Sequence, residues 1–464
     1  MDVTRKILKV IGWTVAVIVG LGVAVYLIAV AINWRDQEPS AAAIQIVSLY
    51  RDRPALADEA NAFIYVMGFS VAPHESPYRM GLRRTRWLEE SNRQGHLDPK
   101  RDPLGKRPSL RLGRFHSIND FNTACRTEVE AACITAFQSS DDVFRQWQAS
   151  ESWLLPRYRE LIHYRGWREP VPFHLTAPLP PFGLVVDSQM LMFLDARVLA
   201  ERGDYSGVRD LLEEDLAFWR RVLESSDTLI SKMVATNSIK RHFELGNLVL
   251  RQIPPEHALS VMPAGWGIPI SDSERSMRRC LVGEWLFTSA SIRNGVLALD
   301  VPHSDSPISR AARGLMAPLY RRQDSMNRYA AYLLETNRLL SAPLDQYENA
   351  VSKAAALAKR TAEDALPPHS AYNIVGQLLT GMGANDFGPY ARRVNDLEGI
   401  RRAAVLAATL RSANLAVTEI AGAVSASALR EPYHNKPFEW DEKEGVITFR
   451  GLELSERSVH RVYY

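Results

Sequence analysis

"LVVDSQMLMFLDARVLAERGDYSGVRDLLEEDLAFWRRVLESS", residues 184–226, carries the pattern that decides the fold. Apolar side chains recur three and four residues apart on both sides of Gly203-Asp204, which is the period of an amphipathic helix. The turn is short, so the two predicted helices should pack antiparallel. The apolar residues of the second helix share one face: Leu211, Leu212, Leu216, Trp219, Val222 and Leu223.

The same period continues outward along the chain. Ser271 and Glu274 have the spacing of a capping box, which predicts a helix from there to a stop near Asn294-Gly295. The glycines of "TGMGANDFG", 380–388, are expected in a helix-to-helix turn, because the Lys-Ser/Thr of a phosphate loop is missing. Further helices are predicted over 228–252, 311–341, 344–364 and 398–414.

Proline-rich stretches separate these helices. The most prominent is "PVPFHLTAPLPPFG", 170–183, since proline interrupts both helices and strand ladders. The hairpin over 190–223 resembles one tetratricopeptide unit, but no 34-residue recurrence follows it. A generic helical hairpin is therefore the better interpretation.

The end of the chain has a different pattern. "KPFEWDEKEGVITFRGLE", 436–453, alternates aromatic and polar residues on both sides of Asp441–Gly445, which predicts a β-hairpin. The expected fold class is thus mainly α, with a helical body and a small C-terminal β-hairpin.

The beginning of the chain predicts a membrane anchor. "VIGWTVAVIVGLGVAVYLIAVAI", 10–32, has no charge and would span about 34 Å as a helix, enough for a hydrocarbon core. Arg5, Lys6 and Lys9 precede it, so the N-terminus should be cytoplasmic and residues 35–464 should lie outside. The alternative is a signal peptide cleaved after Ala29-Val30-Ala31, but the apolar run is longer than such a core requires.

These signals predict a single-pass protein of the bacterial inner membrane with a periplasmic C-terminal part. The missing N-x-Ser/Thr sequon favours a bacterial source. A net charge of +3 without a long basic run argues against nucleic acid as a partner. The expected order of segments is a cytoplasmic N-terminus (1–9), the anchor (10–32), a linker (33–40), an N-terminal helical region (41–169), the main helical region (184–430) and the hairpin tail (431–464).

The tail "EPYHNKPFEWDEKEGVITFRG", 431–451, resembles a tail in uncharacterised bacterial membrane-anchored proteins. The segments 125–133 and 208–233 are similar to parts of the same group, which implies an anchored protein but no activity. The tail is also loosely similar to the Asp-Pro-containing hairpin of type II secretion pseudopilins. The anchor departs from the pilin pattern because it contains no Glu, so the resemblance does not imply assembly into a pilus.

The segment "CRTEVEAAC" spaces Cys125 and Cys133 eight positions apart. An oxidising compartment favours a disulfide over a metal pair, which would need further ligands, or a redox site, which has closer spacing. On one continuous helix the two residues would lie about 12 Å apart, so the bond requires a helix break between Arg126 and Ala132. Cys280 is expected to be a buried free thiol.

Three further residues are candidates for a functional site. Glu284 lies among apolar neighbours, so it either pairs with Arg279 or Arg241, which is the favoured reading, or has a raised pKa. His242 and Glu244 lie two residues apart on different helix faces, where structural or surface roles are favoured. Five histidines lie beside loop-like stretches and could converge: His163, His174, His257, His303 and His369.

Two classes of function remain open. The first is a non-enzymatic envelope scaffold or interaction component that binds another envelope protein, because the sequence shows no recognisable catalytic motif. The second is a membrane-tethered periplasmic hydrolase or lipid-handling protein with a cleft near Glu284. Neither a cofactor nor a metal is expected, and the first class is favoured.

Overall fold

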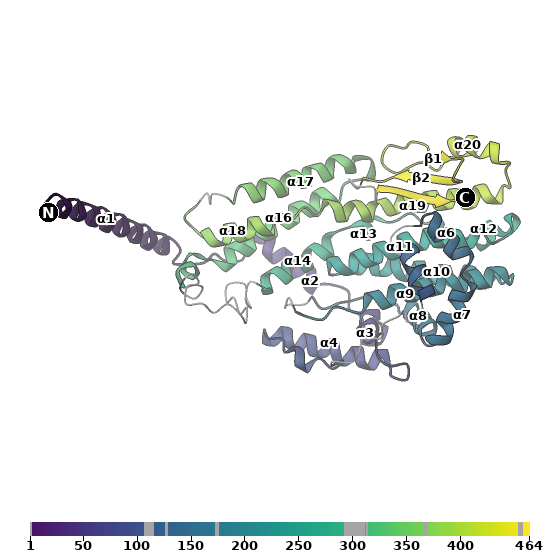
Figure 1. The fold of residues 1–464 in the computed structure, drawn as a ribbon, viewed down its shortest axis with the longest axis horizontal. Coiled ribbons are helices and arrows are strands. Elements are labelled where there is room, and N and C mark those ends of the chain that lie inside the picture. The colour runs from purple at the N-terminus through teal and green to yellow at the C-terminus, as the bar shows by residue number, and fades with distance from the viewer. Residues whose placement is uncertain are drawn as a thin grey trace.

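The computed structural model describes residues 2–105, 116–125, 129–171, 176–291, 311, 314–365, 370–452 and 458–464. The chain forms a mainly helical body with a small antiparallel sheet at one end and a single long helix at the other (Figure 1). The predicted fold class is confirmed.

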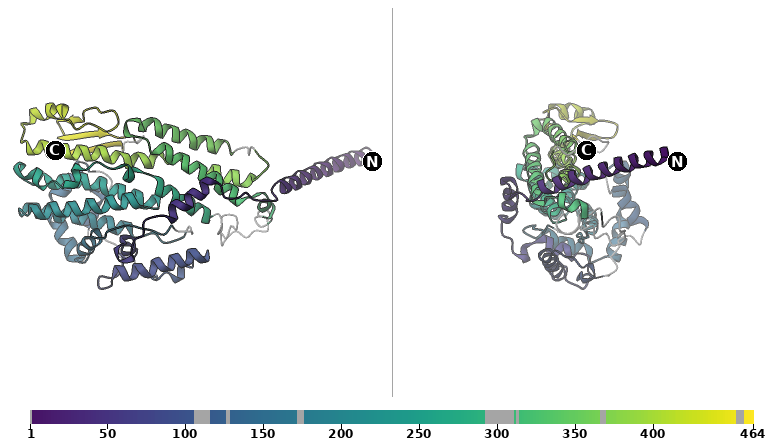
Figure 2. Two further views of the ribbon diagram at one scale, coloured as in Figure 1. Left: turned by 180° about the vertical axis from the view of Figure 1, so that it is seen from behind. Right: turned by 90° about the vertical axis from the view of Figure 1, so that its left-hand side faces the viewer.

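Helix α1 (Asp2–Ile32) projects from the body, and Figure 2 shows this projection in two further views. Its part from Ile7 to Ile32 is long and apolar enough to cross a membrane, and the apolar window within it is not buried by the rest of the chain. Only a lipid or similarly apolar environment would cover this surface. The helix is therefore either a signal sequence or a membrane anchor.

The centre of the body consists of four long helices packed side by side. The predicted hairpin is confirmed as α9 (Phe182–Glu201) and α10 (Tyr205–Ser225), and the predicted apolar face of α10 is buried. Helix α10 packs on α11 (Leu229–Leu250), which in turn packs on α19 (Gly388–Ser412). Most of α11 and α19 is buried, so this layer forms the core.

The N-terminal helices cover one side of this layer. Helices α3 (Ala62–Met67) and α4 (Pro77–Gln94) approach closely at Gly81, where a Cβ would lie 1.6 Å from the carbonyl oxygen of Ile64. A larger residue at Gly81 would therefore force the helices apart. The other helices of this region are α2 (Ala41–Arg51), α5 (His116–Cys125), α6 (Ala131–Gln138), α7 (Asp141–Ser150) and α8 (Leu154–Ile162), with 3-10 turns at Asp58–Ala60 and Pro99–Arg101.

The helix predicted from Ser271 is interrupted. The capping box forms, but α13 ends at Arg275, because Ser276 is extended, and α14 (Arg278–Ser291) begins anew. The predicted stop near Asn294-Gly295 lies outside the described residues. The connection before it contains three short elements: a 3-10 turn (Pro255–His257), α12 (Ala258–Val261) and a 3-10 turn (Ala264–Gly267).

The later helices differ from their predictions mainly in length. The helix predicted over 311–341 is continuous only as α16 (Arg322–Leu340), after the 3-10 turn η6 (Ala317–Leu319). Helix α17 (Tyr347–Glu363) follows the 3-10 turn Leu344–Gln346. The predicted turn at 380–388 is confirmed, since α18 (Ile374–Gly383) ends there and α19 begins at Gly388.

The C-terminal sheet has one strand more than predicted. Strands β1 (Glu439–Asp441) and β2 (Val446–Arg450) form the expected hairpin, and β3 (Val459–Tyr463) pairs with β2 antiparallel. The sheet packs on α19, where the Phe449 ring occupies the space that a side chain at Gly399 would need. Helix α20 (Val417–Ala426) lies between α19 and the sheet in sequence and contacts both.

Candidate functional site

The predicted disulfide between Cys125 and Cys133 is present, with Cα atoms 4.7 Å apart. Helix α5 ends at Cys125 and α6 begins at Ala131, so the required helix break is confirmed. Both cysteines are buried, and the bond staples two short helices together. Cys280 is a buried free thiol, as expected, and burial raises its pKa to about 12.

His242 and Glu244 belong to separate contacts. His242 is fully buried: its Nε2 accepts from Trp266 Nε1–H at 2.8 Å, and its Nδ1 lies 2.7 Å from Asp215 Oδ2. Because an indole N–H can only donate, His242 is neutral and its Nδ1–H donates to Asp215. Glu244 instead pairs with Lys240 at 2.7 Å, one turn away on the same helix.

Asp215 is the centre of this buried network. It accepts hydrogen bonds from His242, from Tyr158 and from Gln189 Nε2, whose shorter contact is 3.1 Å. Trp219 Nε1 donates to the Tyr158 hydroxyl at 2.9 Å. Since all these groups are buried, the network cannot meet a ligand from solvent and serves to hold α8, α9, α10 and α11 together.

Glu284 lines an apolar pocket of about 370 Å³. The ion pair with Arg279 does not form, because Arg279 pairs with Asp227 at 2.9 Å. Burial raises the pKa of Glu284, although a hydrogen bond with the Leu229 backbone opposes this shift. The direction of this shift agrees with the second sequence alternative, a carboxyl group with a raised pKa, while the pair with Arg241 stays a prediction. The described apolar lining includes Phe63, Leu88, Val171, Leu179, Phe182, Ile230 and Phe287.

A second carboxylate, Glu169, lies in the wall of the same pocket. It accepts hydrogen bonds from the backbone amides of Asp227 and Thr228, both at 2.8 Å, and from the Ser231 hydroxyl at 2.7 Å. It thereby satisfies backbone donors at the start of α11. Burial and the nearby charge of Asp227 raise the pKa of Glu169 to about 7, although these donors favour the ionised form. No local pattern in the sequence indicates this contact.

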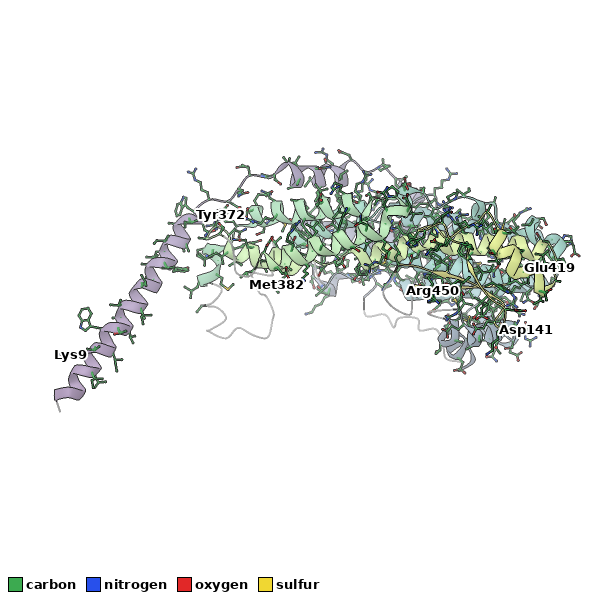
Figure 3. All side chains as sticks on the ribbon, turned by 90° about the horizontal axis from the view of Figure 1, so that it is seen from above. Lys9, Asp141, Tyr372, Met382, Glu419 and Arg450 are labelled. Atoms are coloured by element: carbon green, nitrogen blue, oxygen red, sulfur yellow. A yellow bond between two sulfur atoms is a disulfide. The ribbon has the colours of Figure 1, made fainter. Side chains whose placement is uncertain are left out.

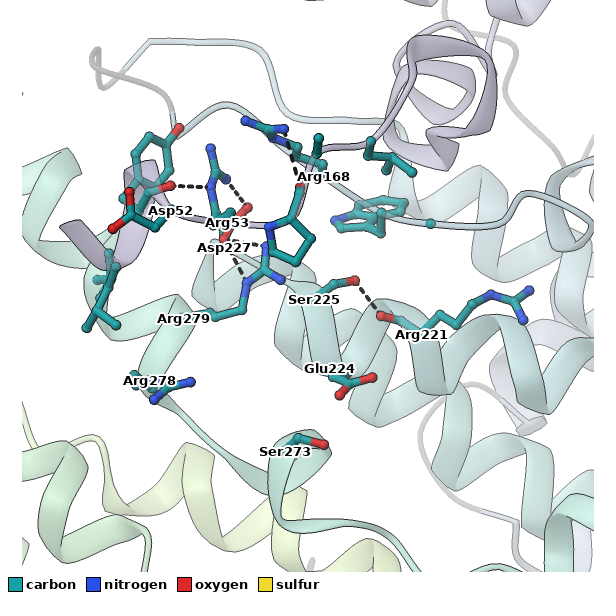
Figure 4. A pocket seen from close by; sticks show the side chains of 18 of the residues that line it. Asp52, Arg53, Arg168, Arg221, Glu224, Ser225, Asp227, Ser273, Arg278 and Arg279 are labelled. Atoms are coloured by element: carbon teal, nitrogen blue, oxygen red, sulfur yellow. Dashed lines mark hydrogen bonds and ion pairs between the residues drawn. The ribbon is translucent and has the colours of Figure 1, made fainter. Parts of the chain in front are cut away.

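On the other side of this wall lies a larger pocket of about 690 Å³ with a basic lining (Figure 4). Its side chains come from the end of α2, the segment before Glu169, the end of α10 and the start of α14. The charged residues in the lining are Arg53, Arg165, Arg168, Arg221, Arg278 and Arg279, against Asp52, Glu224 and Asp227.

Asp227 fixes two of these arginines. It is almost fully buried, and one carboxylate oxygen accepts from Arg53 while the other accepts from Arg279 Nε at 3.0 Å. The Arg53 guanidinium also lies 3.6 Å from the centre of the Tyr50 ring and donates to the Tyr50 carbonyl. Two cations thus share one carboxylate in a rigid arrangement, which leaves one positive charge uncompensated.

The pocket as a whole has an excess of positive charge. Six arginines face three carboxylates, a formal surplus of three charges. The Arg221 Nε atom is buried and has no hydrogen-bond partner among the described residues, while its Nη2 donates to the Ile162 carbonyl. Arg165 and Arg278 are exposed at the pocket. Guanidinium groups in this arrangement are suited to a carboxylate or phosphate group.

This pocket is not indicated by the sequence, because its parts are far apart in the chain. Arg53 and Arg279 are brought together only by folding, and no local motif connects them. The adjacent pairs Arg220-Arg221 and Arg278-Arg279 are visible in the sequence, but such pairs are common on solvated helix faces.

The loop histidines do not define a site within the part of the chain that the structure describes. His163 lies 3.3 Å from Glu214, and the His257 ring lies beside Tyr205, so the two contact different parts of α10. His174, His303 and His369 lie outside the described residues. In the described ranges, no group of three or more His, Cys, Asp or Glu side chains is placed to hold a metal ion.

Compared with known proteins, the chain matches no protein-family model, no curated protein and no solved structure. A function is therefore inferred from the N-terminal apolar helix and from the chemistry of the two pockets.

Proposed function

We propose that this protein is a single-pass, membrane-anchored binding protein of the bacterial cell envelope that acts without catalysis. Its N-terminus is cytoplasmic and its helical body is periplasmic. The arginine-lined pocket binds an anionic group, a carboxylate or phosphate, of its partner. The single observation that carries this proposal is the surplus of positive charge in that pocket.

The anchor and its orientation rest on the first helix. The apolar part of α1 is long enough to cross a bilayer, and its apolar window is not buried by the described residues of the body. Arg5, Lys6 and Lys9 precede the apolar run, which favours retention of that end in the cytoplasm. An uncleaved anchor fits the length of the run better than a cleaved signal peptide does.

The fixed arginines favour binding over chemistry. Arg53 and Arg279 are held by Asp227, so they are oriented before a ligand arrives and lose little side-chain entropy on binding. Arg165 and Arg278 are exposed and can close on an anion. Their contribution should weaken as ionic strength rises, since salt screens exposed charges.

The test is a titration of the full chain in lipid nanodiscs with inorganic phosphate and, separately, with a hexaglutamate peptide. We expect Arg165→Gln combined with Arg278→Gln to weaken binding about thirtyfold, since each of the two charged contacts contributes on the order of 1 kcal/mol. The matched control is Arg83→Gln with Arg202→Gln, which removes two exposed arginines that do not line the pocket. Equal affinities for the pocket variant and the control would contradict the proposal.

A second function is favoured by the apolar pocket at Glu284, which fits the lipid-handling form of the alternative. Ile230 lines this pocket and is 46% exposed, whereas Leu259 is 47% exposed and lies outside it. If the pocket holds an acyl chain, Ile230→Arg should abolish binding of a fluorescent fatty acid, and Leu259→Arg should not. Absence of binding by the unaltered chain would exclude this second function.

A further inference from the structure

The C-terminal end of α1 is joined tightly to the body. Asn33 is fully buried, and its Nδ2 donates to the carbonyls of Ala29 at 2.7 Å and Ala371 at 2.8 Å. The amide of Asn373 donates to Asn33 Oδ1 at 2.6 Å. Asn373 has a left-handed backbone (φ 55°) and caps α18, so the contact is made by a rigid turn.

The segment after Asn33 is held as well. The Asp36 carboxylate accepts from the amides of Gln323 at 2.7 Å and Asp324 at 3.1 Å, which satisfies free donors at the start of α16. Asn327 bonds both the Glu38 carbonyl and the Ser40 amide. The body is therefore attached to the anchor at a fixed angle rather than on a flexible tether.

A part of the body also lies beside α1 itself. The Tyr26 hydroxyl donates to the Leu315 carbonyl at 3.1 Å. Tyr26 precedes the end of α1 by about 9 Å along the helix axis. If α1 crosses the bilayer up to Ile32, Leu315 reaches the depth of the outer interfacial layer. Leu315 and the next residue, Met316, are 58% and 43% exposed, so their side chains are uncovered by protein.

Helix α18 adds a second apolar surface, which the other described residues cover only in part. It contains no charged residue, and Ile374, Leu378 and Met382 follow one another at four-residue spacing along one face. None of the three is buried, and Met382 is 79% exposed. Figure 3 shows Met382 on the side of the body toward which α1 descends, with Tyr372 near the junction.

We propose that Leu315, Met316 and the α18 face of Ile374, Leu378 and Met382 form a membrane-contact surface that inserts into the interface of the outer leaflet. The occupant of this surface is the lipid bilayer, because the fixed junction and the Tyr26 contact place the surface at the level of the anchor's own end. The inference rests on the proposed anchoring by α1. Apolar side chains at such a position gain by leaving water for the acyl boundary.

The test uses environment-sensitive probes on the full chain in phosphatidylcholine and phosphatidylglycerol vesicles. Single probes are attached at Met382→Cys, Leu315→Cys, Val19→Cys in the anchor, and Val417→Cys, which is 61% exposed on α20. The unaltered chain controls for labelling of Cys280, which is buried. Quenching is then measured with lipids brominated near the headgroup end of the acyl chain and, for position 19, which lies about 20 Å along the helix from Ile32, with lipids brominated near the methyl end.

We expect blue-shifted emission and at least twofold quenching at positions 382 and 315, and water-like emission at 417. Quenching at 19 but water-like emission at 382 and 315 would overturn the membrane-contact surface and leave the anchor intact. No quenching at 19 would overturn the anchoring proposal itself. A blue shift at 382 and 315 without lipid quenching would indicate contact with a second protein chain, which also overturns the inference.

Discussion

Two buried aspartates show how differently the same residue is used in this protein. Asp215, in the core, is surrounded by neutral donors from His242, Tyr158 and Gln189, and none of them reaches solvent. Asp227, in the wall of the arginine-lined pocket, is almost as deeply buried, but it is shared by two arginines at the edge of an open cavity.

Burial of a carboxylate is therefore not by itself a sign of function. Both oxygens of the Asp215 carboxylate accept hydrogen bonds from buried donors, so the network stabilises one arrangement of four helices. The Asp227 cluster leaves positive charge in excess beside solvent, and this excess is available to a ligand. The structural role of Asp215 and the binding role of the Asp227 cluster can be told apart by substitutions. Those in the first region should affect stability, and those in the second should affect binding.

The largest effect is expected in the core network. Asp215→Ala removes the acceptor of two buried donors, His242 and Tyr158, and one of the acceptors of Gln189, so we expect a loss of about 3–5 kcal/mol in the free energy of unfolding. Thermal unfolding of the full chain in detergent, followed by near-UV circular dichroism, measures it. Asp210→Ala removes an exposed carboxylate from the same helix and should change stability by less than about 0.5 kcal/mol. A loss below about 1 kcal/mol for Asp215→Ala would show that the network is not a structural centre.

A smaller effect is expected from pH at the pocket wall. The folded-state pKa of Glu169 is raised to about 7, above its ordinary value of 4.5, so the folded protein binds this proton more tightly than the unfolded chain. Its stabilising contribution is therefore complete below about pH 4.5 and is lost as the pH rises through 7, by roughly 3 kcal/mol in all.

Urea unfolding between pH 5 and 8 tests this dependence. Glu169→Gln keeps an oxygen for the Asp227 and Thr228 amides and lets the side-chain amide donate to Ser231, so the variant should fold. It should lose most of the slope, whereas Glu442→Gln, at an exposed position, should keep it. An unchanged slope in Glu169→Gln would assign the dependence to another group.

The smallest change in stability, and the sharpest separation of the two regions, is expected from Asp227→Asn. The substitution keeps the shape of the side chain but removes the charge shared by Arg53 and Arg279, at a cost of about 1–3 kcal/mol. It should also strengthen phosphate binding about threefold to tenfold, because the Asp227 carboxylate no longer neutralises part of the positive charge of the two arginines.

Two readouts accompany this variant. Calorimetric titration with phosphate gives the affinity, and the pH dependence of unfolding should move to lower pH, since Asp227 raises the pKa of Glu169. Asp52→Asn, in the same pocket but with an exposed carboxylate, serves as the control and should have smaller effects on both. Weaker phosphate binding by Asp227→Asn would contradict the assignment of the pocket as an anion site.

The sequence predicted what depends on local pattern. The hairpin of α9 and α10 and the disulfide with its helix break all follow from spacing over a few turns. The prediction was wrong where tertiary contacts decide, as in the break after Arg275 and the late start of α16 at Arg322. The strand Val459–Tyr463 was missed because the polar residues His460 and Arg461 interrupt its apolar pattern, and its buried face forms only by packing against α11 and α19.

The site was less predictable than the fold. Glu284 was singled out correctly as a carboxyl group in apolar surroundings, but its expected ion pair depended on where Arg279 points. His242 accepts a hydrogen bond from Trp266 only because the connection after α11 returns across that helix. The arginine-lined pocket brings together residues from Ser48 to Val282, which are far apart in the sequence. No local pattern could therefore predict it.

The contact between Asn33 and Asn373 also has a consequence for how the protein is made. The two residues are 340 positions apart, so this contact cannot form until the chain has been synthesised as far as Asn373. At ordinary rates of translation this delay is on the order of tens of seconds. During that time α1 is not held to the body by this contact. The angle between α1 and the body is thus set late, by a residue far along the chain.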